Sequence, residues 1–157
     1  LVHSLLFFIG GMFFWTFLEY LLHRYLFHFT GETQTAQRIH YVLHGVHHHF
    51  PRNKNKLFMP PLPGLVLIGI LYFIFKFIIG GYVFAFLPGL VTGYLFYVFL
   101  HYLIHTIKPP KFLEHVWTHH FMHHHRHSEK CFGVSTKIWD RVFGTMPPKK
   151  KNKNSVH

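Results

Sequence analysis

The sequence has very little cysteine and few charged residues. Cys131 is its single cysteine, and only five Asp and Glu stand against sixteen Lys and Arg among 157 residues. One cysteine excludes an internal disulfide and any iron–sulfur or zinc site built from several thiolates. Charged residues make up 13% of the chain, about half of what a soluble domain carries. Any metal must therefore be bound by nitrogen or oxygen, and an ordinary soluble domain is disfavoured.

Long apolar runs take the place of the missing charge. Residues 1–18 contain no Asp, Glu, Lys or Arg, and residues 62–100 contain only Lys76. As a helix the second run would be roughly 58 Å long, about twice the thickness of the bilayer's hydrocarbon core. Gly80 and Gly81 offer a turn in its middle, so the sequence predicts membrane spans at about 1–22, 62–79 and 82–107. The chain starts inside an apolar run without Met, so we expect an incomplete N-terminus.

The basic residues are confined to the segments outside these spans. Fifteen of the sixteen lie within residues 24–56, 108–130 and 137–153. Because spans two and three form a hairpin, these segments all fall on one side of the membrane, which the positive-inside rule makes cytoplasmic. Apolar runs separate the three segments and no DNA- or RNA-binding motif occurs, so we expect no nucleic-acid partner.

These patterns predict one domain, residues 1–157, with an all-α fold. We expect a multi-pass transmembrane helical bundle with a cytoplasmic histidine-rich helical cap, formed by residues 23–61 and 108–145, and a basic tail at 146–157. Helices are expected in the cap at 35–49, 111–127 and 135–143, because few helix breakers occur there. The protein is expected to be integral to the membrane, with its site on the cytoplasmic side.

Ten of the eighteen histidines form four groups at predicted helix ends. Two groups repeat an i, i+3, i+4 spacing, which places imidazoles on one helix face, and a third is an i, i+4 pair. The fourth pair, His23 and His28, is five residues apart and would diverge by about 140° on an ideal α-helix. The ten are His23, His28, His44, His47, His48, His101, His105, His120, His123 and His124. We expect His3, His49, His115, His119, His125, His127 and His157 not to be ligands.

Ten imidazoles that converge are better suited to metal than to pH sensing. Protonated rings would repel one another, and a pH switch needs only a few of them. Ten ligands are too many for one tetrahedral zinc and fit two five- or six-coordinate ions. Glu19 and Asp140 are candidates to accept a hydrogen bond from the free N–H of metal-bound imidazoles, although ordinary salt bridges to Arg24 or Arg141 are an equal alternative. His40 is either a similar supporting residue or an alternate ligand.

Several segments together resemble the fatty acid hydroxylase superfamily, and within it the fatty acid 2-hydroxylases. The resemblance rests on EYLLHRYLFH (19–28), LHGVHHHFP with LFMPP (43–61), HYLIH (101–105), HFMHH (120–124) and FGVSTKIWDRVFGT (132–145). It covers nearly the whole chain. The histidine spacing alone would also fit sterol methyl oxidases, sterol desaturases and carotenoid hydroxylases. Asn53, where relatives often have Asp, and apolar 98–100, where relatives tend to be acidic, depart from the pattern.

The resemblance implies a membrane-bound di-iron monooxygenase with the same ten histidines as ligands. Its substrate would be a lipid acyl chain, hydroxylated with O₂ at the carbon next to the carbonyl. Electrons would come from a separate cytochrome b5-like or ferredoxin-like protein, because no cytochrome b5 domain occurs here. Zinc can replace iron in such a site after purification. A non-catalytic zinc-binding membrane protein is the alternative from another class; transport is disfavoured because the spans hold few polar residues.

Overall fold

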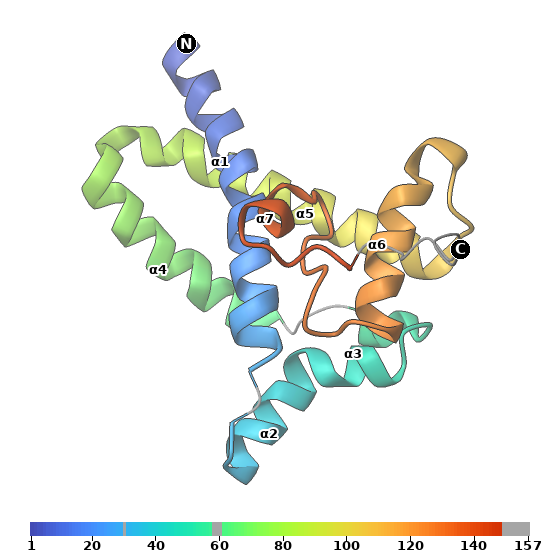
Figure 1. The fold of residues 1–157 in the computed structure, drawn as a ribbon. Helices are drawn as coiled ribbons and strands as arrows, with labels where there is room; N and C mark the ends of the chain where they lie inside the picture. Colours follow the sequence, from blue (N-terminus) through green and yellow to red (C-terminus); the bar gives the residue numbers. More distant parts are fainter. Residues whose placement is uncertain (30, 58–60, 149–157) are drawn as a thin grey trace.

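The computed structural model describes residues 1–29, 31–57 and 61–148, and all its regular elements are helical (Figure 1). The predicted all-α fold is thus confirmed for these residues; His157 and most of the basic tail lie outside them. The elements are α1 (Val2–Leu21), η1 (Leu22–Phe27), α2 (Gln34–His40), η2 (Tyr41–Gly45), α3 (Val46–His49), η3 (Lys54–Lys56), α4 (Pro61–Ile79), η4 (Gly80–Tyr82), α5 (Val83–Thr106), η5 (Lys111–Leu113), α6 (Glu114–His125) and α7 (Ile138–Val142).

Helices α1 and α5 cross at close range because glycines line their contact (Figure 1). A Cβ at Gly89 would lie 2.0 Å from the Phe8 carbonyl oxygen, and one at Gly11 would lie 2.1 Å from that of Phe86. Small residues allow this backbone approach in membrane helices, where packing replaces the hydrophobic effect as the attractive force. Buried Trp15 and Leu90 fill the rest of the crossing. The crossing fixes where the C-terminal ends of both helices lie.

Helix α4 diverges from the α1–α5 pair (Figure 1), and many of its apolar side chains are exposed. Phe73 is 73% exposed and Phe77 is 93% exposed. In the most apolar 18-residue segment of Leu62–Thr106 only 6% is buried, whereas 22% is buried in the corresponding segment of Val2–Phe27. Both stretches are long and apolar enough to cross a membrane. A core helix of a soluble protein would be mostly buried, so this exposure indicates association with lipid.

The cap helices lie near their predicted positions. Residues 34–49 are helical throughout as α2, η2 and α3, and Thr33 caps their start by accepting a hydrogen bond from the Ala36 amide. Helix α6 and the preceding turn cover 111–125, while α7 is shorter than its predicted range. The cap therefore places its histidine-bearing turns beside the C-terminal ends of α1 and α5.

Candidate metal centre

The ten histidines selected by spacing meet in two groups of five. Within each group, one ring nitrogen from every histidine lies within 4.8 Å of all the others. A metal–imidazole bond is about 2.1 Å, so nitrogens on opposite sides of one ion are about 4.2 Å apart and adjacent ones about 3.0 Å apart. The first group is His23, His28, His44, His48 and His123; the second is His47, His101, His105, His120 and His124.

Neighbouring Nε2 atoms have the separation expected of adjacent ligands. His44 Nε2 lies 3.0 Å from the Nε2 atoms of both His23 and His48. In the second group, the Nε2 atoms of His47 and His101 are 3.0 Å apart, and His105 and His120 approach to 2.8 Å. His124 is half-buried, but both of its ring nitrogens are buried and have no hydrogen-bond partner among the described residues. A buried imidazole without a partner is costly, so these groups fit metal ions.

A π-helical turn explains how His23 and His28 come together. The expectation that they diverge assumed ideal α-helical geometry, whereas residues Leu22–Phe27 form a π-helix. Its hydrogen bonds connect residues five apart, which brings positions 23 and 28 toward the same face. The two ring centres are 5.1 Å apart, and both rings belong to the first group.

Two helices each supply both groups. In α6, His120 and His124 join the second group, while His123 between them joins the first. Around α3 the division is reversed: His44 and His48 join the first group and His47 joins the second. All three positions share one broad face, but at about 100° per residue i+4 lies about 40° to one side of i and i+3 about 60° to the other side. The repeated i, i+3, i+4 spacing therefore serves two adjacent sites rather than one.

Burial keeps the cap imidazoles neutral, as metal ligands must be. Loss of hydration lowers the pKa of His48 to about 3 and that of His28 to about 4, with repulsion from nearby histidines as the lesser cause. The same two causes hold the pKa values of His44, His120 and His123 well below the usual histidine range. A neutral ring leaves one nitrogen lone pair free to bind a metal.

Two backbone carbonyls fix which nitrogen is free in the first group. His23 Nδ1 donates to the Phe132 carbonyl over 2.6 Å, and His123 Nδ1 donates to the Lys130 carbonyl over 2.7 Å. Because a carbonyl only accepts, the proton of each neutral ring sits on Nδ1 and the lone pair on Nε2. Sequence reasoning missed these partners, since a backbone carbonyl has no residue-type signature.

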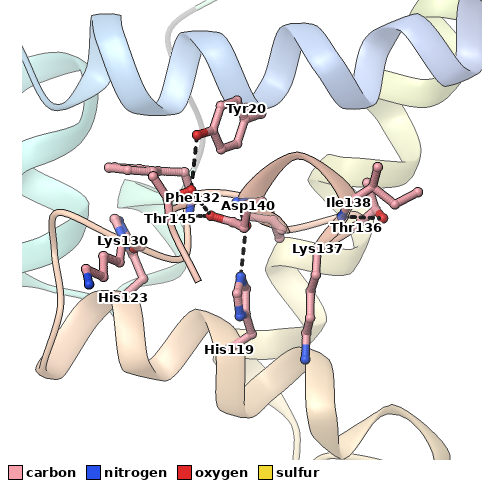
Figure 2. Close-up of polar contacts among 12 residues, drawn as sticks. Tyr20, His119, His123, Lys130, Phe132, Thr136, Lys137, Ile138, Asp140 and Thr145 are labelled. Carbon is pink, nitrogen blue, oxygen red and sulfur yellow. Dashed lines mark hydrogen bonds and ion pairs between the residues drawn. The ribbon is translucent and has the colours of Figure 1, made fainter. Parts of the chain in front are cut away.

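Glu19 and Asp140 are both buried, but neither bonds a histidine of the two groups. Glu19 was expected to reach His23; its carboxylate instead accepts from the Val134 and Ser135 amides at 2.7 and 2.9 Å. Asp140 accepts from His119, which joins neither group, at 2.9 Å (Figure 2). Within the described residues neither acid pairs with an arginine. Both carboxylates hold the loop that follows α6 rather than the imidazoles directly.

The other histidines that the structure describes lie outside the two groups. His40 is half-buried, with its ring centre 6.3 Å from that of His28, so it lies beside the first group without joining it. His127 Nδ1 is 3.6 Å from a Glu129 carboxylate oxygen. His115 is exposed on α6.

An apolar cavity of about 690 Å³ opens beside the histidines. His44, His47 and His101 are among its polar lining residues, with Glu19 and Asn55, and α4 and α5 supply mostly aliphatic walls that include Leu71 and Leu90. A volume of this size is typical of small-molecule sites. Its mostly apolar lining suits a hydrocarbon chain that lies beside the histidines.

The sequence is similar to that of known fatty acid hydroxylases. The family model described as Fatty acid hydroxylase matches residues 8–145. Human fatty acid 2-hydroxylase is 39% identical over 151 residues, covering 91% of this chain and 40% of the human protein. A dihydroceramide fatty acyl 2-hydroxylase of Arabidopsis thaliana is 37% identical over 140 residues, covering 87% of this chain and 59% of that protein. The chain thus spans less than two thirds of these relatives.

A solved structure has the same fold. Full-length scs7p, of which only the hydroxylase domain is visible, superposes with a TM-score of 0.89 at 34% identity, covering 94% of this chain and 57% of that one. The curated ceramide very long chain fatty acid hydroxylase scs7 of Schizosaccharomyces pombe is 35% identical over 150 residues, covering 92% of this chain and 43% of the yeast protein. Sequence match, fold and histidine groups agree, and the chain belongs to the fatty acid hydroxylase family.

Proposed function

We propose that the chain is the hydroxylase domain of a membrane-bound di-iron monooxygenase. The observation that carries this proposal is the pair of five-histidine groups beside an apolar cavity that three of these histidines line. The first group would hold one iron ion and the second group the other. Imidazole suits iron and zinc alike, so zinc is expected to occupy the same sites when iron is scarce.

The substrate proposed is a lipid acyl chain, hydroxylated at the carbon next to its carbonyl. Relatives named fatty acid 2-hydroxylase and dihydroceramide fatty acyl 2-hydroxylase support this position. Leu71 and Leu90 would hold the hydrocarbon, which places the carbonyl end beside His44, His47 and His101. The apolar walls exclude water and set which carbon lies nearest the metals.

Iron bound in these groups would supply the activation of O₂, with two electrons from a separate donor protein. In the overall reaction one oxygen atom replaces the hydrogen of a C–H bond as hydroxyl, and the other leaves as water with two protons. The chain's own contribution is positional: the Phe132 and Lys130 carbonyls orient two imidazoles, and the cavity orients the acyl chain. The basic cap supports placing this site on the cytoplasmic side of the membrane.

Expression in a host without 2-hydroxy lipids tests the proposal. Lipid mass spectrometry should detect 2-hydroxyacyl chains when the full chain and an electron donor are co-expressed, and His120→Ala should abolish them. His115→Ala is the matched control, because His115 is exposed on the same helix, and it should keep near-normal product. Unchanged lipids despite two bound irons and a working donor would contradict the proposal and favour a non-catalytic metal protein.

A further inference from the structure

The loop Lys130–Ser135, between α6 and α7, connects two buried carboxylates to two imidazoles of the first group. Its amides at Phe132 and Gly133 donate to Asp140 over 2.9 Å each. The next two amides donate to Glu19. Its carbonyls at Lys130 and Phe132 accept from His123 and His23. Figure 2 shows this arrangement around Asp140, with His123 and Lys130 on one side and His119 below.

Asp140 holds the loop through a complete set of donors. Two donors reach each carboxylate oxygen: Oδ1 accepts from the Phe132 amide and the Thr145 hydroxyl, and Oδ2 from the Gly133 amide and His119. A carboxylate offers about four acceptor positions, so all are used. Asp140 is fully buried, which makes each of these hydrogen bonds costly to lose.

The loop is tightly packed at Gly133. A Cβ at Gly133 would lie 2.1 Å from the Thr136 carbonyl oxygen and 2.8 Å from Asp140 Oδ2. The Cys131 amide also donates to the Thr145 carbonyl at 2.9 Å, and the Thr145 amide donates back to the Asp140 carbonyl at 2.8 Å. The two carbonyls that orient His23 and His123 are therefore fixed in position by Asp140 and its neighbours.

The second group lacks equivalent support. The Nδ1 atoms of His47, His120 and His124 are buried and have no hydrogen-bond partner in the described part of the chain. We infer that Asp140 is a positioning residue for the first metal site alone, acting through the carbonyls of the loop Lys130–Ser135. This inference rests on the proposed two-ion function, and it makes the two sites unequal in how their ligands are held.

Removal of the Asp140 charge should weaken one ion selectively. Asn keeps one oxygen and replaces the other with an NH₂ donor, so one of the Phe132 and Gly133 amides then faces a donor and loses its acceptor. The loop carbonyls can then turn away from His23 and His123. Mutation of a group that accepts a hydrogen bond from a metal-bound imidazole typically lowers metal affinity about 10- to 100-fold. We therefore expect Asp140→Asn to weaken binding at the first group by about that factor and to leave the second group unchanged.

Zinc stoichiometry of the purified full chain tests this inference. After Zn²⁺ loading and dialysis against a chelator of intermediate strength, the wild type should keep two ions and Asp140→Asn one. His28→Ala and His105→Ala identify the sites, because each removes a ligand of one group. Asp140→Asn combined with His105→Ala should keep none. Combined with His28→Ala it should keep the same single ion as His28→Ala alone.

A general folding defect gives a different pattern. With such a defect, the double variant Asp140→Asn, His28→Ala would lose the ion that His28→Ala alone keeps, and that result would overturn the inference. An Asp140→Asn chain that keeps both ions would also overturn it. Glu129→Gln removes the same charge from an exposed side chain and should keep two ions. A wild type that holds fewer than two ions would contradict the two-ion centre itself.

A milder variant covers the case in which Asp140→Asn does not fold. Thr145→Val removes one of the two donors to Asp140 Oδ1 and leaves the carboxylate in place. It should release the first-group ion at a lower chelator concentration than the wild type, with the second ion unaffected. Equal release of both ions, or no change in either, would refute a site-selective role.

Discussion

At the scale of single residues, the identity of the ligand candidates was readable from the sequence, whereas their partners were not. Eight of the ten histidines could be chosen because i, i+3 and i+4 spacings at helix ends converge, whereas His23 and His28 were chosen only as a pair near a helix end. Their division between two groups depends on which helix faces which, as His47 and His48 show by joining different groups. The true contacts of Glu19 and Asp140 depend on a loop whose path no spacing rule predicts.

One cavity residue should control the length of the acyl chain. Ile68 is on the cavity-lining face of α4, so Ile68→Trp fills space that the hydrocarbon would occupy. We expect the hydroxylated products to shift toward shorter chains, as read by lipid mass spectrometry. Ile70→Trp is the control, because Ile70 is 53% exposed on the same helix and does not line the cavity. An unchanged product distribution in Ile68→Trp would argue against acyl binding there.

At the scale of elements, the helices α4 and α5 lie close to the second and third apolar runs, because glycine and proline limit those runs, while their crossing of a membrane stays a prediction. Gly80 and Gly81 separate α4 from α5 as expected. The π-helical turn η1 was not predicted, since its residues Leu22–Phe27 carry no signal that distinguishes it from an α-helix. That single turn decides whether His23 and His28 share a site.

The α1–α5 crossing should be sensitive to a single methyl group. Gly89→Ala places a Cβ 2.0 Å from the Phe8 carbonyl oxygen, so the helices must separate, at a cost of about 1–3 kcal/mol. Thermal unfolding in detergent should show a lower midpoint and earlier loss of bound metal. Gly69→Ala, on α4, meets no atom within 4 Å and should unfold no earlier than the wild type. Equal midpoints for the two variants would rule out tight packing at Gly89.

At the scale of the whole molecule, the distribution of charge gives a testable orientation. Cys131 is fully buried, and burial raises the pKa of its thiol to about 12. When the folded protein is treated with a thiol reagent, only an introduced cysteine should therefore be labelled, because buried Cys131 does not react. Tyr82→Cys lies in the turn between α4 and α5, and Glu129→Cys lies in the cap.

An impermeant maleimide applied to intact cells should label Tyr82→Cys and spare Glu129→Cys. Opening the cells should make Glu129→Cys reactive, because the basic cap is expected on the cytoplasmic side. Labelling of Glu129→Cys from outside would reverse the proposed orientation without affecting the metal centre itself.

Helices α3 and α6 each carry histidines of both groups, which bears on the distance between the two proposed ion sites. No residue belongs to both groups, so no shared side chain ties them within the described residues. The two groups are instead joined through the backbones of the helices that carry them, which hydrogen bonds along each helix hold rigid. The backbone geometry of α3 and α6 therefore sets the separation of the two proposed ion sites.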